Sequence, residues 1–465
     1  MLRFGGLAAL AALGVLSAAT YASALSAAAW LGVGLLAAHP VVVAVLFVLY
    51  LAAAWLVSVR ILPTKKALAV VLGFGLLFRA LVLPTPVYLS SDLFRYLWDG
   101  RVQLAGVNPY RYAPSAPELA HLRDGEIHPR INRPAARTIY PPAAQWLFAL
   151  AAALAPGSIV GWRLLLLLFD GATVAMLLLL LRRLGVPPTA VIIYAWSPLV
   201  VFEGVQAGHV EAAMIPLILL ALLLRQTGSL VLAGVALGVA VLMKLYPAVL
   251  LPAWWRRDDW RFPAATAATV GLGYLPYVAA LGAGALGFLP EYLASPEDHN
   301  IGLRALLTHP FGFTGEVARS VAMALLFAVM AVALIVIGRR ARQDPPGLWQ
   351  ASALAVCAYL LLVPTAMHPW YVVWVVPFLC VRPSAACTGP VRAGRAARRP
   401  PRRARPGYGL RGEDASRPRA RACSTASWRR CAPSLSYRWR IWVLTVFTDT
   451  YSWSAISGAD SLVGR

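Results

Sequence analysis

The sequence predicts an all-α, polytopic membrane protein, and three observations carry that prediction. The chain of 465 residues is 60% hydrophobic and only 13% charged, whereas soluble domains usually hold about 25% charged residues. Windows of roughly 20 residues without any charge recur along it, such as 41–59 and 320–338, and about 20 apolar residues are what a helix needs to cross a bilayer. These runs are continuous rather than alternating, so they favour helices over a β-barrel.

The apolar runs predict a bundle of about 10–13 transmembrane helices. The first run is expected to be an uncleaved helix rather than a signal peptide, because many further spans follow it. Several runs are too short to cross alone, and the run 139–156 holds three prolines, which fit an irregular segment. The expected spans are 5–23, 41–59, 67–85, 139–156, 160–181, 187–203, 209–224, 229–243, 246–255, 263–283, 320–338, 348–366 and 370–380.

Basic loops predict the orientation of these spans, since cytoplasmic loops are rich in Lys and Arg. The loops that mark the cytoplasmic face hold Arg60, Lys65 and Lys66; Arg182 and Arg183; "WWRRDDWR" at 254–261; and "GRRARQ" at 338–343. The segments 86–138, 203–209, 284–317 and 366–370 then share the outer face. This alternation requires that 139–156 is re-entrant or interfacial, or else that the Arg182 loop faces outward.

The net charge of +23 is concentrated after the expected transmembrane domain, which covers residues 1–381. Segment 382–440 is rich in Arg, Pro and Ala and holds sixteen arginines and two acidic residues. We favour a translated frameshift, which would leave this product truncated and inactive. A disordered tail attracted to anionic lipid is the next interpretation, and nucleic-acid binding is the least favoured. The apolar end, 441–465, is assigned no role.

The first outer segment is where polar and aromatic residues collect. "VYLSSDLFRYLWDGRVQLAGVNPYRYAP", residues 87–114, holds two carboxylates, three arginines, four tyrosines and a tryptophan. Asp92 follows two prolines that end the third span, so it lies near the membrane surface, where an ionisable group is costly and a carboxylate can accept a proton. Arg95 and Tyr96 would share its helical face. Capping of a short helix by Asp92 is the competing interpretation.

The remaining polar residues each leave alternatives open. Asp99 fits a turn, and Tyr110 fits either an aromatic belt or stacking on a sugar ring. His209 and Glu211 in "GHVEA" allow substrate binding, capping or a metal site. The metal site is least favoured, because one helix face cannot present both side chains. Lys244 either extends toward the membrane surface or faces an anion such as phosphate.

Together, these motifs resemble those of a known family. "SDLFRYLWDGR", "GVNPY", "YPP", "GHVEA", "KLYP" and "HPWY" are similar to motifs of the GT-C membrane glycosyltransferases. The chain most resembles the polyprenol-phosphate-mannose-dependent mannosyltransferases of glycosyltransferase family 87, over roughly residues 60–380. The resemblance implies a GT-C-like bundle whose large outer loop, about 86–138, is catalytic and carries short interfacial helices. It also implies inverting transfer of a sugar, expected to be mannose, from a polyprenyl-phosphate donor to a lipid or glycan hydroxyl on the outer face of the plasma membrane.

The resemblance assigns roles to residues of this sequence. It implies Asp92 as the general base, with Lys244, Arg304 and Arg95 expected at the donor phosphate. The expected substrate-binding residues are Tyr96, Asp99, Asn108, Tyr110, Tyr140, His209, Glu211, His368 and Trp370. Neither a cofactor nor a metal ion is expected, and the expected partners are the bilayer, the polyprenyl-phosphate sugar and a glycan or glycolipid acceptor, not nucleic acid. Three spans precede the outer loop where the family usually has one, and the spans expected after "HPWYVVWVVPFL" are missing.

A transporter or flippase of lipid-linked sugars is the alternative function. Transporters usually bind their substrate near the bilayer midplane, between repeated halves. No internal repeat is visible here, and the polar residues of interest cluster at one face, which favours an enzyme. A structural scaffold would not need Asp92, Lys244 and Arg304 together.

Overall fold

The structure, a computed structural model, describes residues 2–30, 34–60, 62–294, 316–364 and 367–381, and these residues form helices and no strand. The predicted all-α polytopic class is confirmed. The chain divides into two units, and all described residues belong to the first, which comprises 1–381 and 444–465. The interpretations of 382–440 and of 441–465 lie outside the described residues.

The described helices have the following bounds. They are α1 (Leu2–Trp30), α2 (Leu35–Val59), α3 (Thr64–Val82), α4 (Asp92–Leu104), η1 (Pro117–Leu122), η2 (His128–Arg130), α5 (Pro142–Leu154), α6 (Ile159–Arg183), η3 (Pro188–Val191), α7 (Ile192–Ala195), α8 (Pro198–Val201), the π-helix η4 (Phe202–Gln206), α9 (Glu211–Gln226), α10 (Leu230–Met243), η5 (Tyr246–Val249), α11 (Leu250–Trp254), α12 (Arg261–Leu281), η6 (Gly282–Leu286), α13 (Leu289–Ala294), α15 (Glu316–Arg340), α16 (Pro345–Leu362), α17 (Pro369–Val373) and η7 (Val376–Cys380).

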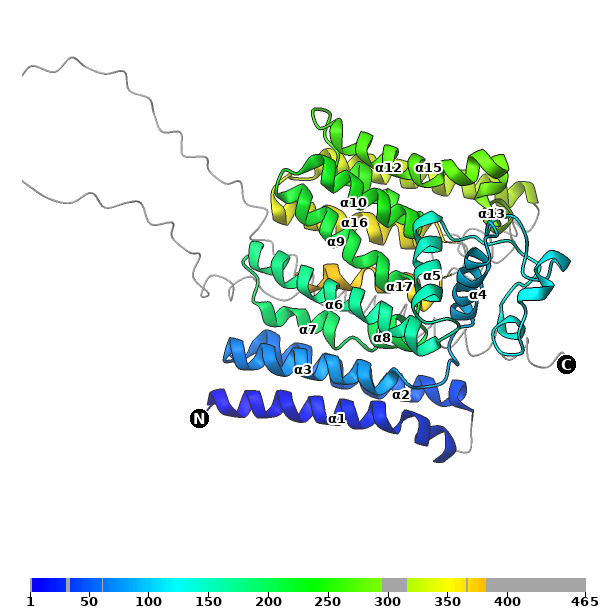
Figure 1. Cartoon of the computed structure of the whole chain (residues 1–465). Coiled ribbons are helices and arrows are strands. Elements are labelled where there is room, and N and C mark those ends of the chain that lie inside the picture. Colours follow the sequence, from blue (N-terminus) through cyan, green and yellow to red (C-terminus); the bar gives the residue numbers. More distant parts are fainter. Residues whose placement is uncertain (1, 31–33, 61, 295–315, 365–366, 382–465) are drawn as a thin grey trace, which may run out of the picture. The chain divides into compact units, whose positions relative to one another are not determined.

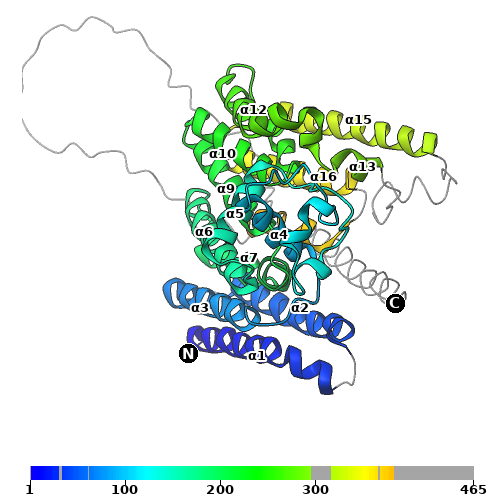
Figure 2. The ribbon, with the colours of Figure 1, turned by 45° about the vertical axis from the view of Figure 1, so that its right-hand side comes forward.

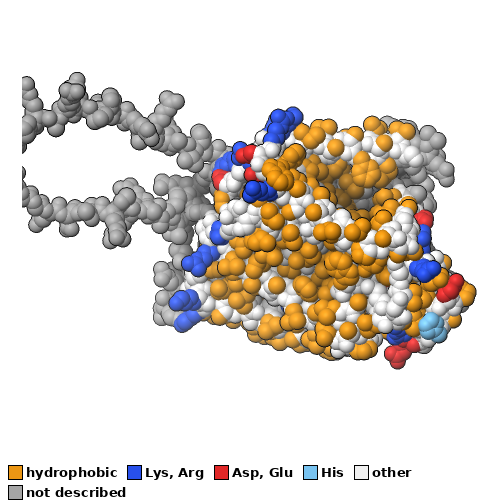
Figure 3. All heavy atoms as spheres, turned by 45° about the horizontal axis from the view of Figure 1, so that its top comes forward, with side chains coloured by type: hydrophobic (Ala, Val, Ile, Leu, Met, Phe, Trp, Pro, Cys, Tyr) orange, Lys and Arg blue, Asp and Glu red, His pale blue; other side chains and the backbone are white. Residues whose placement is uncertain are grey.

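The long helices run side by side, so successive connections alternate between two ends of the bundle (Figure 1). Helices α1, α2 and α3 form a layer along one side, and α6, α9, α10 and α12 follow above it in Figure 1. Orange apolar side chains cover much of the bundle's flank in Figure 3, while Lys and Arg gather at the end where α6 finishes. This distribution is typical of a helical membrane protein, whose lipid-facing flank is apolar.

Six described helices are long and apolar enough to cross a membrane, or seven if the bent pair Pro188–Ala195 and Pro198–Gln206 counts as one span. The described helices of that length are therefore fewer than the expected 10–13. The reason is that several apolar runs are short or broken: α5 has 13 residues and α10 has 14. The bent pair turns by 60° just before Pro198, which cannot continue a helical hydrogen-bond ladder.

The course of helix α5 bears on the two alternatives for the run 139–156 and the Arg182 loop. Its 13 residues span about 20 Å at about 1.5 Å per residue, which is less than the roughly 30 Å of a hydrocarbon core. Together with α4 it lies across one end of the bundle rather than along it (Figures 1 and 2). The chain thus returns to the same end, and α6 then brings Arg182 and Arg183 to the opposite end, where α2 finishes and α3 begins. The four basic loops share that end.

The crossing of α4 and α5 depends on one glycine. A Cβ atom at Gly100 would lie 2.3 Å from the carbonyl oxygen of Phe148, far inside van der Waals contact. Only glycine therefore lets the two short helices touch backbone to backbone. The predicted outer loop, 86–138, contains α4 together with the short helices η1 and η2, so it carries the short helices that the sequence predicted.

Candidate active site

A cavity of about 1260 Å³ lies at the end of the bundle that α4 and α5 cover. Its walls come from segments far apart in the sequence, among them α2, the loop before α4, residues 132–141, residues 244–249, α15 and residues 368–371. The polar part of the wall contains Asp92, Tyr140, Glu203, Lys244 and His368. The cavity is therefore where the predicted outer segments meet.

Asp92 faces this cavity as the first residue of α4, where a negative charge is favourable next to the helix N-terminus. The N-cap position belongs to Ser91, so Asp92 is not the capping residue. Instead its carboxylate accepts hydrogen bonds from the amide of Asn132 and from the hydroxyl of Tyr140, the latter at 3.2 Å. The side chain is 16% exposed. Asp92 is thus oriented by neighbours and still accessible from the cavity.

Tyr140 links the two charged residues of the cavity. Its hydroxyl donates to Asp92, and its ring centroid lies 6.0 Å from Nζ of Lys244. The turn before α5 holds it there, because Pro141 and Pro142 start that helix and leave Tyr140 extended at its edge. Burial, followed by the charge of Asp92, raises the pKa of Tyr140 well above its ordinary value. The phenol therefore stays protonated and remains a hydrogen-bond donor.

Lys244 ends α10 at the cavity wall, where the following turn leads into Pro247. Its ammonium forms an ion pair with Glu211 of α9. It also lies 5.8 Å and 5.2 Å from the ring centroids of Tyr246 and Tyr371, within the range of cation–π attraction. The side chain is 13% exposed, so part of it faces the cavity. Of the two alternatives for Lys244, this position favours an anion partner in the cavity.

A stack of three rings closes the wall beside Asp92. The indole of Trp370 lies between His368, at 4.3 Å and 4° between ring planes, and His209, at 4.2 Å and 22°. His368 and Trp370 line the cavity. His209 is completely buried behind them, with Nδ1 3.0 Å from a carboxylate oxygen of Glu203 and Nε2 4.0 Å from one of Asp92.

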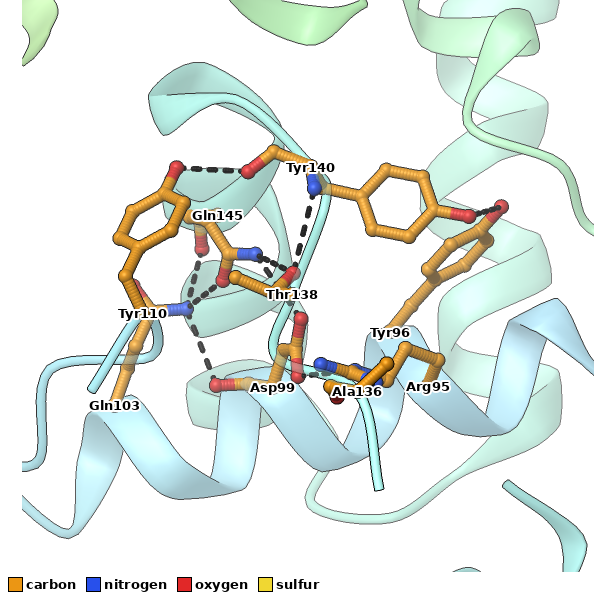
Figure 4. Close-up of polar contacts among 9 residues, drawn as sticks. All are labelled: Arg95, Tyr96, Asp99, Gln103, Tyr110, Ala136, Thr138, Tyr140 and Gln145. Carbon is orange, nitrogen blue, oxygen red and sulfur yellow. Dashed lines mark hydrogen bonds and ion pairs between the residues drawn. The ribbon is translucent and has the colours of Figure 1, made fainter. Parts of the chain in front are cut away.

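A polar network behind the wall holds α4 against the segment 136–145 (Figure 4). Arg95 donates through Nε to Asp99 at 2.8 Å and through Nη1 to the carbonyl of Ala136 at 3.0 Å. Gln145 donates to the other carboxylate oxygen of Asp99 at 3.0 Å and to Thr138 at 2.8 Å. These buried groups satisfy one another, so they fix the loop that carries Tyr140.

The structure brings some predicted site residues to the cavity and places others behind its wall. The predicted residues that line it are Asp92, Arg95, Tyr140, Lys244, His368 and Trp370. Those that do not are Tyr96, Asp99, Asn108, Tyr110, His209 and Glu211. Contact of this second group with substrate stays a prediction, since these six residues lie outside the cavity lining. Arg304 lies outside the described residues.

Three of this second group show what they do instead. Tyr96 packs face to face on Phe148 at 4.7 Å, and its hydroxyl lies 3.3 Å from that of Tyr140. Tyr110 donates to the carbonyl of Tyr140 at 2.7 Å, and the side chain of Asn108 accepts from the peptide N–H of Tyr110 in the turn before it. Of the predicted alternatives for Asp99 and Tyr110, neither a turn nor an aromatic belt is found, since both are buried supports of the loop.

Several cavity residues were not predicted from the sequence. Asn132, Arg133 and Arg137 line the cavity from the loop before α5, and Tyr246 and Tyr371 line it beside Lys244. The two tyrosines stand inside the motifs "KLYP" and "HPWY", which could have indicated them. No comparable signal marks the loop residues, because Arg133 reaches its place through a left-handed backbone with φ of 49°.

Within the described residues, no group of three or more His, Cys, Asp or Glu side chains could hold a metal ion. The model of glycosyltransferase family 87 matches residues 138–364 of the chain. No curated protein matches the chain. The matched segment includes Tyr140, His209, Glu211 and Lys244, and it starts after α4.

Proposed function

Since the chain is a GT-C-like membrane glycosyltransferase of family 87, we propose that it transfers mannose from a polyprenyl-phosphate donor to a hydroxyl of a lipid or glycan acceptor. One observation carries the proposal: Asp92 and Lys244 both contact Tyr140 at the wall of one cavity, Asp92 through the hydroxyl and Lys244 over the ring. A proton acceptor and a cation therefore flank the same phenol at one cavity wall, where a sugar can lie within reach of both.

The reaction follows from these two positions. The carboxylate of Asp92 takes the proton of the acceptor hydroxyl while the hydroxyl oxygen forms a bond to C1 of the sugar. The bond from C1 to the phosphate oxygen breaks, and its electron pair goes to the lipid phosphate. Lys244 stabilises the charge of that leaving phosphate. Attack and departure on opposite sides of C1 invert its configuration.

The apolar part of the cavity suits a lipid-linked donor. Phe327, Met330 and Leu334 of α15 and Val249 of η5 line it next to the polar residues. Phe327 is 45% exposed, although it lines the cavity. This apolar wall would suit a polyprenyl chain that lies along α15 while its phosphate reaches Lys244.

The distribution of charge supports an active site on the outer face of the plasma membrane. The loops with Arg182, Arg183, Arg339 and Arg340 finish α6 and α15 at the end opposite the cavity. Cytoplasmic loops carry an excess of such residues. We therefore place the cavity outside, where the acceptor would belong to the cell envelope.

The test is a transfer assay with the purified protein in bilayers. Labelled polyprenyl-phosphate mannose is supplied with membrane glycolipids, and the labelled product is identified. We expect transfer, and we expect Asp92→Asn to reduce kcat by about 10²- to 10⁴-fold, the range that a general base contributes. Donor binding should persist, because the phosphate partner Lys244 is unchanged.

Glu118→Gln is the matched control, since Glu118 is an exposed carboxylate of the same loop outside the cavity. It should transfer at the rate of the unmodified protein. Full activity of Asp92→Asn would remove the general-base role. Movement of the intact donor across the bilayer without product would instead support the transporter alternative.

A further inference from the structure

The completely buried His209 has no direct part in the proposed transfer, yet it lies next to the proposed base. Its Nε2 is 4.0 Å from a carboxylate oxygen of Asp92, and its Nδ1 is 3.0 Å from one of Glu203. The cavity does not reach it, because Trp370 covers its ring face. A residue so placed can act on substrate only through Asp92.

The backbone around His209 fixes the direction of the ring. The π-helix η4 directs Glu203 inward, and the peptide N–H of His209 donates to the Glu203 carbonyl at 3.0 Å. Gly208 has a φ of 71°, and a Cβ atom there would lie 2.9 Å from Leu93 and 3.1 Å from Trp162. Trp162 also donates to the Gly208 carbonyl at 2.8 Å. Single π-turns of this kind are frequent at functional sites.

We propose that His209, held by Glu203, is a positioning residue that orients the Asp92 carboxylate for the transfer. This inference rests on the proposed function. Both ring nitrogens lie within ion-pair distance of a carboxylate, so a doubly protonated imidazolium would present one N–H to each. Asp92 then has a neighbour on three sides: Asn132, Tyr140 and His209.

The charges around His209 support the positive ring. Glu203 faces it from η4, Asp92 from α4 and Glu211 from α9. Glu211 is already paired with Lys244. The remaining two carboxylates flank a single imidazolium, and an unpaired charge at such a buried position would be costly. Without the ring, Asp92 would lose the neighbour that faces it from behind the cavity wall.

The test is the pH dependence of transfer in His209→Gln and Glu203→Gln. For His209→Gln we expect the acid limb of kcat/KM to move to higher pH by about one unit or more, because a nearby opposite charge is lost. The kcat should fall by up to about 100-fold from misorientation of the base. The KM for donor and acceptor should stay within about twofold, since the cavity wall is unchanged. Glu203→Gln should move the same limb in the same direction by less.

His128→Gln is the control, because His128 lies in the outer loop away from the cavity and its ring packs on Trp98 at 5.2 Å. Its pH profile should match that of the unmodified protein. Thermal unfolding in detergent identifies folded variants, and Glu203→Gln decides the question if His209→Gln does not fold.

An unmoved acid limb in a folded variant overturns the positioning role, as does a raised acceptor KM at unchanged kcat, which would mean substrate contact. If the unmodified protein transfers no mannose, the proposed function itself fails. The two failures are therefore distinguishable.

Discussion

Two buried ion pairs differ in how many of their polar atoms are hydrogen-bonded. One joins Arg79 of α3 to Asp170 of α6, and the other joins Lys244 to Glu211 at the cavity. In the first, Arg79 donates to both oxygens of Asp170, at 2.5 Å and 3.1 Å, and to the carbonyls of Gly75 and Ala195. The Tyr194 hydroxyl also donates to Asp170 at 2.8 Å. Neither charge of this pair lines the cavity.

The cavity pair, Lys244 with Glu211, is less complete. One oxygen of Glu211 accepts from Lys244 and from Tyr246, while the other is buried with no hydrogen-bond partner among the described residues. Lys244 is surrounded by aromatic rings and partly faces the cavity. The difference teaches that burial of an ion pair does not by itself mark function in a membrane protein. A charged side chain that partly faces a cavity, as Lys244 does, is the better indication.

The largest effect on stability is expected at the Arg79–Asp170 pair, which we call the closed pair because other groups surround both of its charges. Asp170→Asn leaves the guanidinium of Arg79 without its counter-charge inside the bundle. Breaking a buried pair from one side costs about 3–5 kcal/mol, so we expect the free energy of unfolding in detergent to fall by that amount. The rate per folded molecule should stay unchanged, because neither residue reaches the cavity.

The double variant Arg79→Leu/Asp170→Leu serves as the control for this prediction. Replacing both partners by apolar residues leaves no buried charge and is often close to neutral. Its stability should therefore recover most of the loss. A stable Asp170→Asn with reduced transfer would reverse the comparison and give the closed pair a functional role.

A smaller effect, on binding rather than folding, is expected at the cavity pair. Lys244→Met removes the cation while keeping an apolar stem of similar length. A hydrogen bond to a charged group contributes about 1.5–3 kcal/mol, so the donor KM should rise by about 10- to 100-fold. Titration with polyprenyl-phosphate mannose at fixed acceptor measures it.

Lys244→Met also leaves Glu211 unpaired, which should lower stability. A second variant separates this loss of stability from the loss of donor binding. In Lys244→Met/Glu211→Gln no buried charge remains, so the thermal unfolding temperature should return toward that of the unmodified protein. Donor affinity should stay weak. Recovery of donor affinity together with stability would mean that Lys244 acts on the fold alone.

The sequence was sufficient for the fold class and for the grouping of the basic loops at one end of the bundle, because both depend on local composition. Continuous apolar runs and clustered arginines can be read without knowing any contact. Its prolines and the alternation of basic loops marked the run of α5 as irregular, and the structure places this short helix across one end of the bundle. The Arg79–Asp170 pair could not be predicted in this way. The two residues are 91 positions apart inside two expected spans, and no local sequence pattern indicates that they are in contact.

The candidate site was only partly predictable for the same reason. Asp92, Tyr140 and Lys244 stand next to prolines or in motifs, where a polar residue at a helix end indicates a membrane-edge site. The distinction between a residue that faces the cavity and one behind it depends on packing. His209 and Trp370, for example, come from distant motifs yet stack at 4.2 Å.

A third ion pair, exposed on the outer loop, extends the comparison to the smallest effect. The side chains of Arg101 and Asp124 are 28% and 32% exposed. Asp124 also accepts from the peptide N–H groups of Glu126, Ile127 and His128. Burial opposes ionisation, but these hydrogen bonds and Arg101 together outweigh it and lower the pKa of Asp124 to about 2.

The lowered pKa of Asp124 determines how the stability that this pair contributes depends on pH. A carboxyl group whose pKa is depressed in the folded protein stabilises it above the unfolded value of about 3.9, and that contribution is lost as the pH falls toward 2. Asp124→Asn should therefore lower the free energy of unfolding at pH 7 by no more than about 1 kcal/mol, as for other exposed pairs. The difference from the unmodified protein should shrink as the pH falls through about 4 to about 2, while transfer at pH 7 persists. A difference that stays constant over this range would mean that Asp124→Asn destabilises the fold through lost packing rather than through lost charge. The decrease in effect from the Arg79–Asp170 pair to the Lys244–Glu211 pair would then not extend to the Arg101–Asp124 pair.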